Sequence, residues 1–190
     1  MKSLHSILLI TSLLLSSGCG SFMASIQSEA IEDDPGERTY GAQVEDESIE
    51  TKAKINISAA HEELKNSHFS VTSYNGYVLI VGQAPSEERK QQASQVVKKI
   101  RGVRRIYNEL EVAGNSSAMT RSSDTWITTK VKSALLADSN IEGGRIKVVT
   151  ENGVVYLMGL VSHPEAERVT ETTRSSAGVQ KVVQLFEYFD

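Results

Sequence analysis

The side chains that could do chemistry in this chain are few and far apart. It has a single cysteine, Cys19, and four histidines, of which His61, His68 and His163 lie beyond the N-terminal segment. These histidines have neither the spacing of metal ligands nor a carboxylate motif beside them. No nucleophile elbow, phosphate-binding loop or dinucleotide-binding glycine pattern occurs. The sequence therefore predicts no enzyme, no metal site and no cofactor.

Cys19 stands at the end of what we interpret as an export signal. Lys2 gives a positive start, and the apolar run over residues 7–15 is too short to span a bilayer comfortably. The run ends in Leu15-Ser16-Ser17-Gly18-Cys19, which resembles the bacterial lipobox, where a small residue precedes a cysteine that is acylated and becomes the new N-terminus. Ser16 departs from the motif, which has an aliphatic residue three before the cysteine.

The cysteine count agrees with acylation, because a sole cysteine can form no internal disulfide. We therefore expect residues 1–19 to be a lipoprotein signal peptide and Cys19 to be the lipid anchor that carries palmitate. The alternative is an ordinary secretory signal with an incidental cysteine. Gly20 follows Cys19, whereas many lipoproteins retained at the inner membrane have aspartate there. Resemblance to that sorting rule implies the periplasmic leaflet of the outer membrane.

The net charge of the chain is −4. A general nucleic-acid-binding protein needs a basic surface, so we expect no nucleic-acid partner.

The rest of the chain contains an internal repeat. The residues that recur 76 to 78 positions later are Asp46, Ile49, Thr51, Lys52, Lys54, Asn75-Gly76, Gly82 and Gly102-Val103. Polar, turn-rich segments precede and separate the two copies. The sequence thus predicts a flexible tether over 20–45, module 1 over 46–112, a linker over 113–123 and module 2 over 124–190.

Each repeat has the order helix, strand, strand, helix, strand. Asn-Gly between apolar runs predicts a tight hairpin, because both turn positions need positive φ. The hairpins join residues 69–74 to 77–81 and residues 146–150 to 154–158. Gly102 and Gly178 are expected at the position just after the second helix of each module. The final strands are expected over 103–112 and 179–189.

These features resemble the BON domain family. The segments that carry the resemblance are 41–46, 78–82, 124–131 and 148–160. The tandem arrangement resembles most closely the dual-BON outer-membrane lipoproteins, the family of division- and outer-membrane-stress-associated lipid-binding proteins. We therefore expect an α+β fold of two tandem BON-like modules, each α-β-β-α-β with a three-stranded mixed sheet and two helices on one face. The resemblance also implies a role in cell envelope integrity and cell division, and a lipid-binding first helix in module 2.

Trp126 lies on that first helix of module 2. The apolar face expected to meet the core consists of Ile127, Val131, Ala134 and Leu135. Trp126 lies off this face, where module 1 has Ser48. Since the fold tolerates serine there, we interpret the indole as a bilayer-interface residue whose ring lies near the acyl boundary. The alternatives are that it packs against module 1 or anchors a protein partner.

Four further residues complete the predicted phospholipid-binding set with Trp126, namely Lys130, Ser133, Leu136 and Arg121. Residues 121–133 contain three basic side chains and one acidic side chain, whereas the matching helix of module 1 has two basic and three acidic ones. The start of the helix would add free N–H groups and a positive dipole end, which favour phosphate.

The hypothesis is therefore an anchored lipoprotein that binds anionic, phosphatidylglycerol-like phospholipid through the first helix of module 2. Module 1, with its acidic first helix, is expected to pack on module 2 or to face an envelope protein partner. The alternative function is a protein-interaction adaptor for envelope or cell-wall machinery, with Trp126 as its interface anchor.

Overall fold

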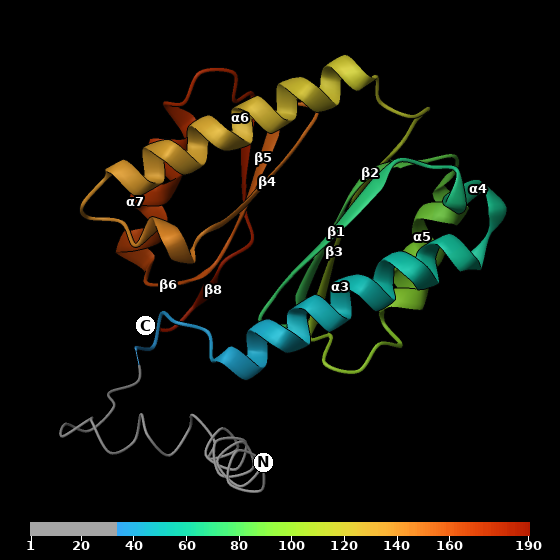
Figure 1. Ribbon diagram of the computed structural model, residues 1–190, viewed down its shortest axis with the longest axis horizontal. Coiled ribbons are helices and arrows are strands. Elements are labelled where there is room, and N and C mark those ends of the chain that lie inside the picture. Colours follow the sequence, from blue (N-terminus) through green and yellow to red (C-terminus); the bar gives the residue numbers. More distant parts are fainter. Residues whose placement is uncertain (1–33) are drawn as a thin grey trace, which may run out of the picture. The chain divides into compact units, whose positions relative to one another are not determined.

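A computed structural model gives the fold of residues 34–190 (Figure 1). The predicted signal peptide with Cys19 and the first part of the predicted tether lie outside the described residues. None of the helices within residues 34–190 combines the length and the apolar character that a membrane-spanning helix requires.

Module 1 contains two helices, a hairpin, a third helix and a last strand. The bounds are α3 Tyr40–Ala60, α4 Glu62–Lys65, β1 Phe69–Tyr74, β2 Tyr77–Ala84, α5 Glu87–Val97 and β3 Arg105–Val112. The sheet has the order β1-β2-β3, with β1 antiparallel to β2 and β2 parallel to β3. A parallel pair needs a crossover connection, and α5 supplies it.

Module 2 repeats this arrangement. The bounds are α6 Ala118–Ala137, the short 3-10 helix η1 Gly143–Arg145, β4 Lys147–Glu151, β5 Val154–Met158, β6 Leu160–Val161, α7 His163–Arg174, β7 Lys181–Gln184 and β8 Glu187–Tyr188. Its sheet has the order β4-β5-β7 with the same strand directions, and β6 pairs in parallel with β8. The predicted α+β class, with a three-stranded mixed sheet in each module, is confirmed.

The last strand of module 2 differs from the single strand expected over 179–189, because it is divided into β7 and β8. Its parallel hydrogen bonding nevertheless continues across the break. Leu185 N donates to Leu157 O at 2.8 Å, and Glu187 N donates to Gly159 O at 2.9 Å.

Two helices begin earlier than predicted. α3 starts at Tyr40, inside the predicted tether 20–45, and α6 starts at Ala118, inside the predicted linker 113–123. Hydroxyl N-caps set both starts: Thr39 Oγ1 accepts from Ala42 N at 3.1 Å, and Ser117 Oγ accepts from Thr120 N at 3.1 Å. The aspartates taken to open the modules, Asp46 and Asp124, therefore lie inside the helices, where both are buried.

The hairpin turns follow the prediction. Asn75 and Gly76 have φ of 50° and 74°, and Asn152 and Gly153 have φ of 49° and 75°. This is the pair of left-handed residues that a tight two-residue hairpin requires.

Gly102 and Gly178 also have positive φ, at 88° and 97°, but the prediction that each directly follows a helix is wrong. α5 ends at Val97 and α7 ends at Arg174. In each module a tighter turn follows the helix before the glycine. Ile100 N donates to Val97 O at 3.0 Å in module 1, and Ser176 N donates to Thr173 O at 3.1 Å in module 2.

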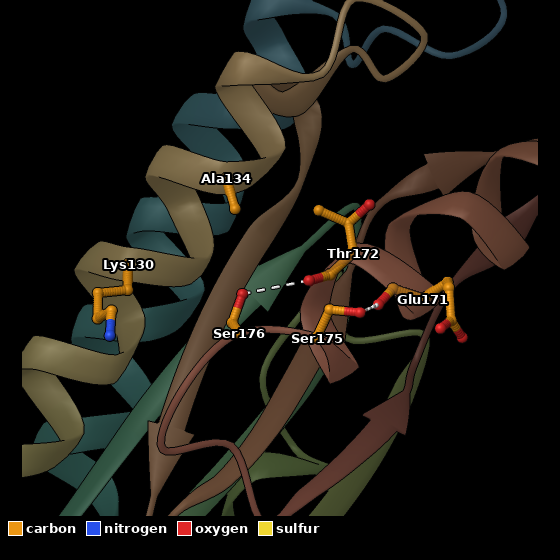
Figure 2. A pocket seen from close by; sticks show the side chains of 6 residues that line it. All are labelled: Lys130, Ala134, Glu171, Thr172, Ser175 and Ser176. Carbon is orange, nitrogen blue, oxygen red and sulfur yellow. Dashed lines mark hydrogen bonds between the residues drawn. The ribbon is translucent and has the colours of Figure 1, made fainter.

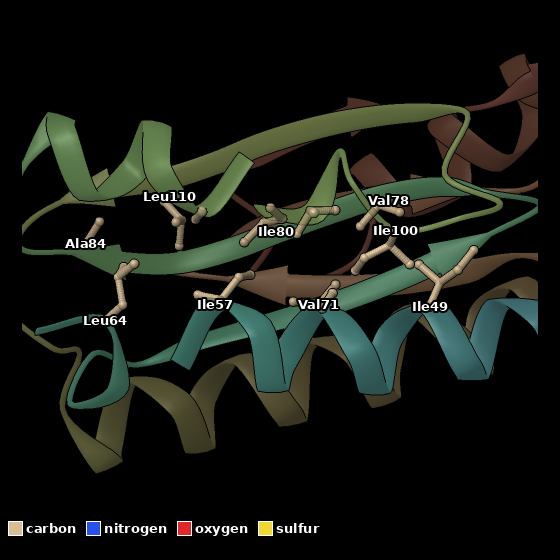
Figure 3. Packing of buried hydrophobic residues seen from close by; sticks show 12 residues of the cluster. Ile49, Ile57, Leu64, Val71, Val78, Ile80, Ala84, Ile100 and Leu110 are labelled. Atoms are coloured by element: carbon tan, nitrogen blue, oxygen red, sulfur yellow. The ribbon is translucent and has the colours of Figure 1, made fainter. Parts of the chain in front are cut away.

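The core of module 1 lies between its helices and one face of its sheet (Figure 3). Ile49 and Ile57 of α3 pack with Val71, Ile80 and Leu110 of the three strands, and each of the five is at most 2% exposed. Module 2 has its own cluster of buried residues from α6, α7 and its sheet. The helices of each module thus cover one face of its sheet.

A third apolar cluster joins the two modules. Its buried members come from the sheet faces turned away from the helices, and they are Tyr74, Leu79, Val81, Tyr156, Met158 and Leu185. Two related polar contacts border it. Asn75 Nδ2 donates to Glu187 Oε2 at 2.7 Å, and Asn152 Nδ2 donates to Glu111 Oε2 at 2.9 Å. The turn asparagine of each module therefore binds the last strand of the other.

Candidate functional site

Helix α6 turns one face to the core and presents the opposite face to solvent. Ile127, Val131 and Leu135 are at most 4% exposed, as predicted for the core face. Ala134, also expected there, is only half-buried, because it lies at the edge of this face and lines a groove toward α7. At about 100° per residue, residues seven apart stay in one stripe along the helix. Trp126, which is 56% exposed, shares its stripe with Met119, which is 83% exposed.

The contacts of Trp126 are with its own module. Lys130 Nζ lies 3.8 Å from the centroid of the indole ring, a cation–π contact. A Cβ placed on Gly178 would lie 3.8 Å from Cζ3 of the indole, so the ring edge rests beside this glycine. More than half of the side chain remains in solvent, and the alternative that Trp126 packs against module 1 is therefore wrong.

The other predicted site residues divide into two groups. Ser133 is exposed and lies in the Trp126 stripe, so Trp126, Lys130 and Ser133 are brought together. Leu136 is 67% exposed and lies about 80° around the helix from Trp126. Arg121 lies about 140° away, and its guanidinium donates to Ser116 O. The structure does not bring Arg121 beside Trp126, because five residues along a helix lead to the other flank.

The only acidic side chain within α6 is Asp124, and it is directed inward. Its carboxylate accepts from Asn152 N at 3.0 Å and from Gly153 N at 2.8 Å. The outward face of α6 therefore shows Lys130 without an acidic side chain of the same helix beside it. Asp46 makes the equivalent bonds to the hairpin turn of module 1. This role was not predicted from the sequence, although the aspartate and the Asn-Gly turn recur together in both modules.

The positive end of the α6 dipole does not lie at Trp126. The helix begins at Ala118 and is capped by Ser117, so Trp126 lies about 12 Å farther along the axis at about 1.5 Å per residue. The expectation that free N–H groups at the helix start favour phosphate beside Trp126 is therefore wrong. The earlier start has a second consequence, because it adds Met119 to the exposed stripe.

A groove of about 450 Å³ opens beside Lys130 (Figure 2). Lys130 and Ala134 of α6 line one wall, and the other wall is the end of α7 and the turn after it, with Glu171, Thr172, Ser175 and Ser176. Ser175 Oγ donates to Glu171 O at 3.0 Å, and Ser176 Oγ donates to Thr172 O at 3.1 Å. No sequence motif indicates this groove, because it depends on where the end of α7 lies against α6.

The model of the BON domain matches residues 45–114 and 123–188. The chain belongs to the BON domain family. The family resemblance seen in the sequence is thereby confirmed. The second match begins five residues after the start of α6, so the first turn of this BON helix, with Met119, lies outside the matched segment.

The sequences of three relatives align with most of this chain. Outer membrane lipoprotein DolP of Haemophilus influenzae is 35% identical over 153 residues, which cover 80% of this chain and 79% of that protein. A 21 kDa hemolysin of Actinobacillus pleuropneumoniae is 37% identical over 151 residues, covering 80% and 78%. Osmotically-inducible protein Y of Escherichia coli is 30% identical over 142 residues, covering 73% and 70%.

The first helices of the two BON modules differ in what they expose. α6 exposes Met119, Trp126 and Leu136, whereas α3 exposes Tyr40, Val44 and Ile55. α3 also carries Glu45, Glu47 and Glu50 in addition to its buried aspartate. It also carries Lys52 and Lys54, which its glutamates outnumber, so an anionic surface would be attracted more by α6 than by α3.

Two of the three histidines of the BON modules make local contacts, whereas His68 Nε2 of module 1 lies 3.9 Å from Glu151 Oε2 of module 2. His61 Nδ1 accepts from Glu63 N at 3.2 Å at the start of α4. His163 stacks on Tyr188 with ring centroids 4.1 Å apart, and its hydrogen bond lowers the pKa of the Asp190 carboxyl. Across residues 34–190, no three His, Cys, Asp or Glu side chains gather in a way that could hold a metal ion.

Proposed function

We propose that this chain is a non-enzymatic, lipid-anchored BON protein of the bacterial envelope whose second BON module contacts anionic phospholipid through α6. Acylation at Cys19 would hold it in the periplasmic leaflet of the outer membrane, where it would support envelope integrity. The envelope placement is supported by the relative named outer membrane lipoprotein DolP. The phospholipid contact is supported by the exposure of Trp126 and by Lys130 Nζ at 3.8 Å from its ring.

The chemistry of the α6 surface suits a bilayer interface. An indole places its apolar ring near the acyl boundary and keeps its N–H among the headgroups. Met119 precedes it in the same exposed stripe. Each basic side chain near an anionic lipid surface contributes about 1 kcal/mol, and Lys130 is available beside Trp126 on a helix whose single carboxylate is turned inward. Since acyl chains would already anchor the chain, this contact would orient module 2 on the membrane.

The exposed side chains of α3 and α6 also favour a second candidate, a protein-interaction adaptor. Exposed aromatic side chains are common anchors of protein interfaces. Both Tyr40 of α3, which is 81% exposed, and Trp126 of α6 could serve in that way. The adaptor requires no preference between neutral and anionic lipid, and this difference separates the two candidates.

Vesicle flotation tests the proposal. The polypeptide from residue 20 to 190, produced without acylation, contains every helix and strand described above. We expect it to float with phosphatidylcholine vesicles that contain phosphatidylglycerol and to remain behind with phosphatidylcholine alone. Trp126→Ala and Lys130→Glu should each weaken flotation, and the Lys130→Glu effect should shrink in high salt.

The matched control is Tyr40→Ala, which removes an exposed aromatic side chain from the first helix of the other module. It should float like the unmodified protein. If Trp126→Ala also floats unchanged, α6 is not the lipid contact. If the unmodified protein floats with neither lipid, the adaptor becomes the better account.

A further inference from the structure

Lys130 contacts the Trp126 ring and also lines the groove between α6 and the end of α7 (Figure 2). Its ammonium covers the ring at 3.8 Å. A phospholipid in contact with Trp126 and Lys130 would therefore hold its headgroup at the mouth of this groove. At about 450 Å³, the groove lies within the size range of small-molecule sites, about 300–1,000 Å³.

The wall opposite Lys130 offers hydrogen-bond acceptors. The hydroxyl protons of Ser175 and Ser176 are already donated to the backbone oxygens of Glu171 and Thr172, so each hydroxyl offers its oxygen lone pairs to a ligand. The Glu171 carboxylate is exposed, accepts only, and takes part in none of the hydrogen bonds or ion pairs among residues 34–190. The C-terminal end of α7 adds the negative end of a helix dipole.

A cation on one wall and acceptors on the other fit a ligand of matching polarity. Lys130 suits the phosphate of a phosphodiester, and the acceptor wall suits a group with O–H or N–H bonds at the far end. We propose that this groove selects phospholipids whose headgroup ends in hydrogen-bond donors, such as the hydroxyls of glycerol or the ammonium of ethanolamine. The inference rests on the proposed function and states which headgroups the site prefers.

The test compares lipids of equal charge. The unacylated chain 20–190 is titrated with phosphatidylcholine vesicles that contain the same fraction of phosphatidylglycerol or of phosphatidylmethanol. The headgroup of phosphatidylmethanol ends in a methyl group and has no hydrogen-bond donor. We expect about threefold to tenfold tighter binding to phosphatidylglycerol, the range that one net hydrogen bond gives. A second pair, with phosphatidylmethanol constant in a phosphatidylethanolamine or phosphatidylcholine background, shows whether an ammonium serves as well.

In the double variant Glu171→Ala/Ser176→Ala, the ratio of the affinities for the two lipids of a pair should fall close to one. The control Glu167→Ala removes another exposed carboxylate one turn earlier on α7, outside the groove, and should keep the preference. Thermal unfolding of each variant verifies the fold.

A preference in either lipid pair that is lost in the double variant supports the proposal and identifies the headgroup. A preference that survives in the double variant overturns it. Equal binding within both pairs also overturns it, yet leaves anionic lipid contact by α6 in place. Binding to none of these vesicles overturns the proposed function together with this inference.

Discussion

Replacing Asp124 by alanine should destabilise the fold far more than an ordinary substitution on α6. The carboxylate accepts from Asn152 N at 3.0 Å and from Gly153 N at 2.8 Å, and the residue is 6% exposed. A hydrogen bond to a charged group contributes about 1.5–3 kcal/mol net. Two such bonds are offset in part by release of a buried charge, so we expect about 3 kcal/mol less free energy of unfolding.

Asp46 provides an internal comparison. It accepts from Asn75 N at 2.7 Å and from Gly76 N at 2.9 Å, and also from Arg38 Nη1 and Ser73 Oγ at 2.6 Å each. Asp46→Ala should therefore cost more than Asp124→Ala. Urea unfolding followed by circular dichroism measures both, with Ser122→Ala as an exposed control on α6 expected within about 0.5 kcal/mol of the unmodified protein. An Asp124→Ala loss as small as that of the control would refute the reasoning.

Three further outcomes follow from the same structure. Gly76→Ala should destabilise the fold more than Gly153→Ala. A Cβ at Gly76 would lie 2.5 Å from the backbone oxygen of Gly102, whereas a Cβ at Gly153 would lie 2.7 Å from the side chain of Gln180, which can move. Equal losses of unfolding free energy in urea would contradict this. Burial alone would raise the pKa of Glu187, but hydrogen bonds from Arg104 and Asn75 hold it below its ordinary value. The ionised Glu187 carboxylate therefore contributes its full stabilisation above about pH 4.3, and this stabilisation is lost as pH falls through the lower folded-state pKa. The unfolding midpoint of Glu187→Gln should accordingly fall less steeply between about pH 6 and pH 3 than that of the unmodified protein. An unchanged slope would count against a stabilising role of the Glu187 carboxylate. Cys19→Ala should abolish fatty-acid labelling, and a variant that is still labelled would exclude Cys19 as the anchor.

The hairpins and the core could be predicted because their signals are local. Asn-Gly requires two left-handed residues, and the turns at Asn75 and Asn152 have them. The exposure of Trp126 could be inferred because Ser48 occupies the same position in the other module. Comparison of equivalent positions in the two modules thus distinguishes residues that the fold requires from residues that are particular to one module.

The helix starts and the flank of Arg121 could not be predicted in the same way. Residues 40–45 and 118–123 follow polar segments, and the capping roles of Thr39 and Ser117 become apparent only once the helices are seen. Charge alone suggests Arg121 as a site residue, whereas its position depends on how far around α6 it lies from Trp126. The groove at Lys130 depends on the tertiary approach of the end of α7, which no local pattern encodes.

Fluorescence of Trp126 tests the lipid contact of α6 most directly, because it is the only tryptophan in the chain. With just over half of the side chain exposed, roughly 100 Å² is available for insertion, worth up to about 2.5 kcal/mol. Vesicles that contain phosphatidylglycerol should shift the emission of the unacylated chain 20–190 to the blue, and phosphatidylcholine vesicles should shift it little. An emission maximum that neither vesicle moves would contradict insertion of Trp126 and with it the proposed lipid contact.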